Sequence, residues 1–487
     1  MAKRKQQSTF ERLKSGKLNR EQRKELIRKI EVEDPRLPVL YQNVAGIDVG
    51  NESHMVSVPM DRDERPIREF GSWTQALQEL VEWLRACDIV WVVMQSTGVY
   101  WIALYDVLER AGFQVCLTNA RDTKNLPGRK SDVQEAQWLR KLFSYGLLRN
   151  SFRPPEEIRQ LRSVWRLRDR HVKDAAEEIQ HMQKALTQMN IQLANAISDV
   201  SGVTGQAIIR AILGGERDPY KLADLRDYRV QASREEIARS LEGTWREEDL
   251  FELQDAVDRY DFCQQQMRRC DGKLKALLEK IPSRPAMPGK AEGRAAENEA
   301  PKKRRGQPDR GPAARKNQPT GFDLQAELKR ICGVDLTRID GVGVMTVQTF
   351  VSEVGPDMSA FQSEGHLVSF LGLAPNRQVS GGKLIRHERR RNKSRVASAL
   401  RMAASTLQNS DSYLGARFRH LRARLGPGKA IKAMAAYLAR LIYRMLTRGE
   451  EWVDRGAADF EKRHRMRQEQ TVRRLAKSLG FDLKPAA

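Results

Sequence analysis

Four polar residues in the first third of the chain have the types and spacing of a metal-dependent acidic site. Asp48 and Gln95 each end a short apolar run, and Asp132 and Glu135 stand three residues apart where a helix is predicted to begin. Residues at i and i+3 share one helix face, and adjacent central strands would bring Asp48 and Gln95 together. Three carboxylates and one amide are oxygen ligands suited to Mg²⁺, with Mn²⁺ as the alternative ion. A pair of such ions polarises a phosphodiester and stabilises its leaving oxygen.

Each of these residues also has a purely structural interpretation. A lone Asp at a strand end commonly forms a turn or caps a helix, and acidic residues at a helix start complement the helix dipole. The combination, on this succession of strands, favours a metal site with Asp48, Asp132 and Glu135 as the ligands.

Ser380 is the candidate nucleophile. It precedes Gly381 and Gly382, and a basic run over 386–395 follows. A hydroxyl beside so many cations can attack a phosphate; the alternative is a serine that stabilises a turn. The basic residues near these motifs are predicted to contact a phosphate backbone, namely Arg129, Lys130, Lys383, Arg386, Arg389, Arg390, Arg391 and Lys393.

Residues 336–350 match the helix-hairpin-helix pattern. Gly341 and Gly343 precede an apolar helical stretch, and such glycines let backbone amides approach a DNA phosphate at a helix N-terminus. An ordinary joint between two helices is the competing interpretation.

Short apolar runs and helical periodicities indicate how these residues are positioned. Strands are predicted over 44–50, 54–59, 67–70, 89–94 and 113–118, with helices over 76–84, 99–111 and 133–145. Three strands followed by alternating helices and strands predict a mixed sheet with helices on its faces. This order of elements is that of the ribonuclease-H-like fold.

Two apolar seams follow. One steps by three and four from Ile158 to Leu193, interrupted by Arg168, and the second runs from Leu250 to Leu277. They predict coiled-coil helices that pair as an antiparallel hairpin or between subunits; a long helix packed on its own domain is the alternative.

The fold class is therefore α/β plus all-α. The predicted segments are a basic flexible arm (1–40), the mixed-sheet domain (41–152), a coiled-coil helical domain (153–281), a disordered basic linker (282–322), a mainly helical domain with the helix-hairpin-helix (323–455) and a charged tail (456–487).

The net charge of the chain indicates which class of molecule it binds. The 487 residues carry a formal net charge of +23, which favours a polyanion, and nucleic acid fits the distributed Lys and Arg better than an anionic membrane does. No apolar run of about 18 residues predicts a membrane span. The N-terminal residues do not form a signal peptide, and five scattered cysteines indicate reduced thiols. These features predict a cytoplasmic protein.

Four motifs in order carry a resemblance to a known family. They are GIDVG at 46–50, QSTGVYW at 95–101, GRKSDVQEA at 128–136 and SGGK at 380–383. With the helix-hairpin-helix, they closely resemble the DEDD-type insertion-sequence transposases over about residues 41–455.

The resemblance implies a RuvC-like N-terminal domain, a coiled-coil middle and a C-terminal serine transposase domain. It implies a recombinase that excises and inserts its own element through a circular intermediate, guided by a structured bridge RNA that pairs with donor and target DNA. The four acidic positions fall on Asp48, Gln95, Asp132 and Glu135, and the nucleophile falls on Ser380. The acidic cluster of one subunit would work with the serine of another, in a dimer or tetramer joined through the coiled coil.

Two positions depart from the family pattern. Gln95 stands where Glu is usual, which removes a negative charge from the metal site, and Glu52 is a substitute carboxylate nearby in sequence. Glu135 stands where Asp is usual. A junction-resolvase-like nuclease that uses water, and a nucleic-acid-binding relic without activity, are the alternative functions.

Overall fold

The computed structural model describes residues 38–96, 98–119, 132–285, 317–375, 377–380, 383–387, 394–449 and 456–481. The chain forms two compact units, Met1–Arg153 and Pro154–Ala487. Most of the predicted arm and linker lies outside the described residues, and the finer division into six segments stays a prediction.

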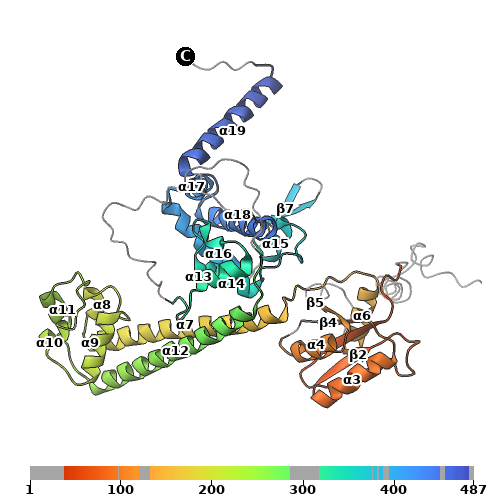
Figure 1. The fold of residues 1–487 in the computed structure, drawn as a ribbon, viewed down its shortest axis with the longest axis horizontal. Helices are drawn as coiled ribbons and strands as arrows, with labels where there is room; N and C mark the ends of the chain where they lie inside the picture. Colours follow the sequence, from red (N-terminus) through yellow and green to blue (C-terminus); the bar gives the residue numbers. More distant parts are fainter. Residues whose placement is uncertain are drawn as a thin grey trace, which may run out of the picture. The chain divides into compact units, whose positions relative to one another are not determined.

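In its described residues the first unit has the predicted order of elements, with strands preceding the helix that is labelled α3 in Figure 1. They are β1 (Val44–Val49), β2 (Ser53–Ser57), β3 (Ile67–Gly71), α3 (Thr74–Ala86), β4 (Trp91–Gln95), α4 (Trp101–Arg110), β5 (Gln114–Thr118) and α6 (Asp132–Ser144).

The five strands form one mixed sheet in the order β3-β2-β1-β4-β5. The pairs β3–β2 and β2–β1 are antiparallel, whereas β1–β4 and β4–β5 are parallel. The predicted ribonuclease-H-like mixed sheet is therefore confirmed.

The alternation of side chains along β1 shows which helices cover each face of the sheet. Ala45, Ile47 and Val49 pack in the same cluster as buried residues of α3 and α4, whereas Val44 packs with Leu139 and Phe143 of α6. Because successive strand residues point to opposite faces, Gly46 and Asp48 lie on the face that α6 covers.

The second unit begins with a helical hairpin whose far end carries four short helices. Its elements are α7 (Glu156–Gln188), α8 (Leu193–Ala196), α9 (Val203–Leu213), α10 (Pro219–Ala223), α11 (Arg234–Ser240) and α12 (Glu247–Lys280). The long helices α7 and α12 lie side by side (Figure 1), so both seams are used within one chain. Whether any seam also joins subunits stays a prediction.

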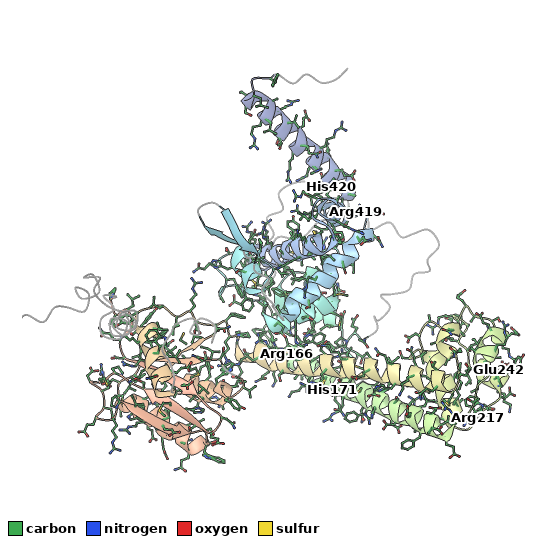
Figure 2. All side chains as sticks on the ribbon, turned by 180° about the vertical axis from the view of Figure 1, so that it is seen from behind. Arg166, His171, Arg217, Glu242, Arg419 and His420 are labelled. Atoms are coloured by element: carbon green, nitrogen blue, oxygen red, sulfur yellow. The ribbon has the colours of Figure 1, made fainter. Side chains whose placement is uncertain are left out.

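Helix α7, which carries the first apolar seam, contacts two different parts of the second unit. Near the start of α7, Trp165 donates a hydrogen bond through Nε1 to Thr349 Oγ1 at 3.3 Å. Arg166 binds both carboxylate oxygens of Glu353, at 2.7 and 2.6 Å (Figure 2). Further along, Met182 and Leu186 pack in a core with Leu253 and other buried residues. The N-terminal half of α7 thus contacts the helical region that follows the linker, and its C-terminal half packs against α12 within the hairpin.

Arg168, which interrupts the seam, is paired inside it. Its side chain and that of Asp271 on α12 are 3% and 4% exposed, and they form two hydrogen bonds, one of them from Nη2 at 3.4 Å. Arg168 also donates to the carbonyl of Asn317 at 2.8 Å, and Asp271 accepts from Thr320 N at 3.0 Å. The pair therefore fixes the hairpin register and ties the segment after the linker to it.

The rest of the second unit is mainly helical, as predicted. Its elements are α13 (Leu324–Cys332), η1 (Leu336–Arg338), α14 (Val344–Glu353), α15 (Glu364–Phe370), β6 (Arg377–Ser380), β7 (Lys383–His387), α16 (Arg395–Thr406), η2 (Leu407–Asn409), α17 (Tyr413–Leu425), α18 (Pro427–Arg448) and α19 (Gly456–Ser478). No described helix combines the length and apolar character needed to cross a bilayer.

We expect Asp271→Ala to destabilise the hairpin by about 3–5 kcal/mol, because it leaves a buried guanidinium without its counter-ion. Urea unfolding followed by helical circular dichroism measures this. The exposed pair Lys184–Glu252, 3.6 Å apart between the same two helices, is the matched control, and Glu252→Ala should cost less than about 1 kcal/mol. Equal effects of the two variants would contradict the role given to the buried pair.

Candidate active site

The parallel pairing of β1 and β4 places Asp48 next to Gln95. Ile47 is the register partner of Met94, so the next residue along each strand is Asp48 on β1 and Gln95 on β4. Both strands end here, and residues in register share one face of a sheet. The adjacency that the sequence predicted is confirmed at the level of the backbone.

Gly46 explains how α6 reaches these strand ends. A Cβ on Gly46 would lie 2.1 Å from the carbonyl oxygen of Ala136 and 2.7 Å from the amide nitrogen of Arg140. Only a glycine permits such a close approach of helix and strand backbones. The backbone of α6 directly after Glu135 is therefore held against β1, and Glu135 itself reaches the end of β4.

Gln95 and Glu135 are in direct contact. Gln95 Nε2 donates a hydrogen bond to Glu135 Oε1 at 2.6 Å, and the Gln95 side chain is buried, with the residue 5% exposed. A carboxylate accepts only, so the amide must present its nitrogen to it. An amide at position 95 therefore contacts Glu135 without the charge repulsion that a second carboxylate would bring.

Asp48 is half-buried and opens onto a pocket of about 420 Å³. Two further carboxylates line this pocket, Glu52, which the sequence suggested as a substitute, and Glu69. The strand register places Glu69 on the same face as Asp48, because Asp48 pairs with Met55 and Met55 pairs with Glu69. Sequence reasoning missed Glu69, since only the pairing of β3 brings it to this face; it accepts a hydrogen bond from Ser53 Oγ at 2.5 Å.

Asp132 is the first residue of α6, one turn before Ala136. Its backbone position is on the same helix as Glu135, and its side chain lies outside the described part of the structure. Arg129 and Lys130 of the preceding loop also lie outside it, as do Arg389, Arg390, Arg391 and Lys393.

Ser380 is the last residue of β6 and pairs with Lys383, the first residue of β7. The two strands are antiparallel, and Arg386 on β7 pairs with Gln378. The sequence predicted a glycine-rich turn after Ser380 and did not predict the strands around it. The reason is that this two-stranded hairpin is short and polar, without the apolar alternation that marks a strand.

The stretch predicted as a helix-hairpin-helix, residues 336–350, contains η1 and most of α14, and its DNA-binding role stays a prediction. Gly341 has φ +79°, and a Cβ there would lie 2.6 Å from the carbonyl oxygen of Ala403 on α16. Gly343 is the N-cap of α14 and provides no side-chain hydrogen bond to it. Gly341 thus lets the turn before α14 approach the backbone of α16 closely, and its role at a phosphate stays a prediction.

The sheet order is that of a ribonuclease-H-like domain, and the family comparisons indicate which class of enzyme carries it. A family model described as a transposase, of the DEDD type, matches residues 45–191. A second model, for the transposase IS116/IS110/IS902 family, matches residues 334–419. The chain therefore belongs to the IS110-type transposases, enzymes that act on DNA. None of the curated proteins compared with the chain matches it.

A DEDD-type transposase domain implies a divalent metal ion. The described donors fit such an ion, because the half-buried carboxylates Asp48 and Glu135 stand on the same face of the sheet at the strand ends. Hard cations such as Mg²⁺ take oxygen ligands of this kind.

We expect Gly46→Ala to abolish DNA cleavage and to lower the melting temperature, because the added methyl group would displace the first turn of α6 from β1. Gly71→Ala on β3 is the matched control. A Cβ there would meet Trp73 Cδ1 at 3.4 Å and Ala76 Cβ at 3.5 Å, which are ordinary contacts, so activity should stay within about twofold of wild type. An active Gly46→Ala protein would contradict this account of how Glu135 is placed.

Proposed function

We propose that this transposase cuts and rejoins DNA by attack of Ser380 on a scissile phosphate, assisted by a divalent-metal site of Asp48, Asp132 and Glu135. The observation that carries the proposal is the direct contact of Gln95 with Glu135, at the strand ends where Asp48 also lies. Asp48 also lines an open pocket, which supports access of a metal ion and a phosphate to this end of the sheet.

In the proposed step, Ser380 Oγ forms a bond to phosphorus while the bond from phosphorus to the 3′ oxygen breaks. The serine proton is lost to solvent or to a nearby base, and the departing 3′ oxygen takes up a proton. The products are a DNA strand joined to Ser380 through its 5′ phosphate and a strand with a free 3′ hydroxyl. Attack of another 3′ hydroxyl on that phosphate releases the serine, so the bond energy is retained without ATP.

The bound metal would neutralise charge on the phosphate and on the leaving oxygen. The residues of the chain position it. Asp48 projects from a strand end, Glu135 is held by Gln95, and the packing of α6 on Gly46 restricts how far the two carboxylates can separate.

Two features of the second unit support DNA binding beside the serine. Ser380 ends a strand whose partner begins with Lys383 and contains Arg386, so two basic residues belong to the same hairpin backbone as the proposed nucleophile. The N-terminus of α14 has no side-chain cap, and uncapped amides at a helix start are donors suited to a phosphate.

The partners that we propose are the two element ends, the target DNA and a structured bridge RNA, in a dimer or tetramer at the bacterial nucleoid. The net charge of +23 supports binding of more than one nucleic acid. Because the serine and the acidic residues belong to different units of the chain, a subunit can donate its serine to the acidic centre of another.

We expect Ser380→Ala to reduce strand transfer by at least about 1,000-fold, as for other nucleophiles, while DNA and RNA binding measured by gel shift stays within about twofold. Recombination of an element-end substrate with its bridge RNA is the measurement. Normal recombination by this variant would rule out the serine mechanism.

Mixed oligomers of two inactive variants test whether the serine and the acidic residues of one reaction come from different subunits. Ser380→Ala and Asp48→Ala proteins, each inactive alone, should regain activity when assembled together if the two groups act in trans. No recovery, with mixed assembly verified by two affinity tags, would restrict the chemistry to one subunit.

A second prediction concerns Gln95→Glu. The added carboxylate increases the negative charge of the site, so the Mg²⁺ concentration for half-maximal activity should fall by about threefold to tenfold. Without metal the variant should melt at a lower temperature than wild type, because two carboxylates would then occupy the 2.6 Å contact. Gln95→Leu, which removes the amide without adding charge, should instead raise the Mg²⁺ requirement; the same direction in both variants would contradict the assignment.

The competing function is hydrolysis by the acidic centre with water as the nucleophile. A covalent protein–DNA adduct, trapped by denaturation during the reaction and absent in Ser380→Ala, supports the serine mechanism. Cleavage that produces free 5′ phosphates and is unchanged in Ser380→Ala would support the nuclease.

A further inference from the structure

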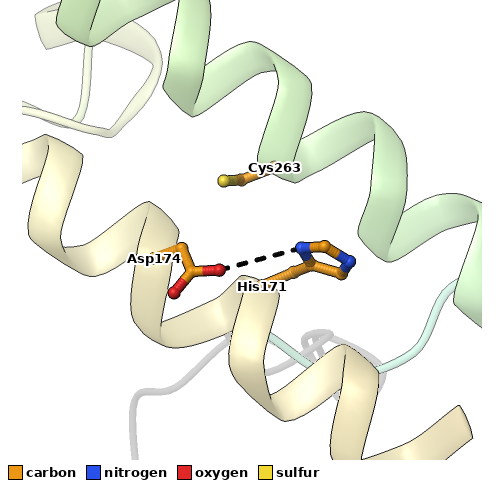
Figure 3. Close-up of side chains that lie close together, drawn as sticks. All are labelled: His171, Asp174 and Cys263. Carbon is orange, nitrogen blue, oxygen red and sulfur yellow. Dashed lines mark ion pairs between the residues drawn. The ribbon is translucent and has the colours of Figure 1, made fainter.

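The middle of the helical hairpin brings together three side chains of the types that bind transition metals. His171 and Asp174 come from α7, and Cys263 comes from α12 (Figure 3). One ligand atom from each lies within 4.8 Å of the other two, and His171 Nδ1 is 3.9 Å from Asp174 Oδ2. In the described ranges this is the one such group of three among His, Cys, Asp and Glu side chains.

The hairpin register places these residues opposite one another. His171 and Asp174 are three apart and share one face of α7. On one side of them Arg168 pairs with Asp271, and on the other Gln188 donates to Asp249 at 3.1 Å. These two cross-helix contacts fix the antiparallel alignment, and Cys263 fills the seam position between Tyr260 and Met267.

We propose that His171, Asp174 and Cys263 bind a Zn²⁺ ion that links α7 to α12. A thiolate, an imidazole and a carboxylate are the ligands that zinc takes in proteins, at about 2.0–2.3 Å each. Mg²⁺, which prefers oxygen, would not compete well here. Three protein ligands leave a fourth position for water, as in open zinc sites.

Ligand atoms around a tetrahedral zinc ion lie about 3.3–3.7 Å apart, so the three side chains must close by about 1 Å on binding. Asp174 has room to rotate toward the other two side chains, because 47% of its side chain is accessible, whereas that of His171 is 16% accessible. The exposed carboxylate also marks the route by which an ion would enter, whereas Cys263 provides a buried sulfur at the far side.

Binding of a zinc ion at this site should release a proton from the Cys263 thiol. Burial, and then the carboxylates of Asp174 and Glu178, raise the pKa of the Cys263 thiol above its ordinary value. The free protein therefore holds a neutral thiol, and a zinc ion must displace its proton. Affinity should therefore fall as the pH falls, because protons compete with the ion for the Cys263 sulfur.

The structural consequence is a cross-link halfway along the hairpin. The short helices α8–α11 lie at one end of α7 and α12, and the contacts to α14 lie at the other. An ion at this point would hold the two long helices in register and would stabilise the hairpin independently of the acidic site in the first unit.

Co²⁺ is the probe for the test, because a thiolate bound to it gives a charge-transfer absorption that oxygen ligands do not give. We expect the reduced full-length protein, in an Asp48→Ala background, to bind one Co²⁺ with this absorption and to lose it on addition of Zn²⁺. Cys263→Ser should abolish the absorption. Cys270→Ser is the matched control, because Cys270 is a buried free thiol on the same helix, and it should leave the absorption unchanged.

His171→Ala and Asp174→Asn provide a test that does not depend on the buried cysteine. Each should weaken Co²⁺ binding by at least about tenfold and should remove the rise in melting temperature that Zn²⁺ gives to the parent protein. Absence of the absorption from the parent protein, its survival in Cys263→Ser, or Zn²⁺ stabilisation that is unchanged in His171→Ala would each overturn the proposal.

Discussion

The contact between α6 and β1 at Gly46 is the constraint on which the acidic centre depends. With no side chain at this position, the backbone of α6 lies against the strand, and its first turn projects over the ends of β1 and β4. The Gln95–Glu135 hydrogen bond follows from that placement. Because the packing is backbone on backbone, small changes in side chains elsewhere on α6 have little power to move the centre.

In the proposed metal site, Gln95 is an amide at a position where the family resemblance predicts a carboxylate. Its nitrogen binds Glu135, which orients the remaining carboxylate and lowers the electrostatic cost of assembling the site without metal. The exposed carboxylates Glu52 and Glu69 border the same pocket as Asp48, so the local negative charge does not depend on the four motif positions alone.

In the second unit, helix α7 makes contacts with both α12 and α14. One amphipathic helix packs on α14 through Trp165 and Arg166 and on α12 through a buried ion pair and an apolar seam. The buried pair specifies the register, since a slip along the hairpin would leave two charges unpaired in the core. The proposed zinc site depends on that same register.

The sequence alone determined the order of strands and helices, the two seams and the residues at the strand ends, because these follow from the local periodicity of apolar residues. Only the tertiary structure decided that α7 and α12 pair within one chain, that Arg168 meets Asp271, and that Gln95 binds Glu135. It also added the hairpin of β6 and β7, the carboxylate Glu69 and the cluster of His171, Asp174 and Cys263. Each of these joins residues distant in sequence, and their meeting depends on strand register and helix packing, which local patterns do not encode.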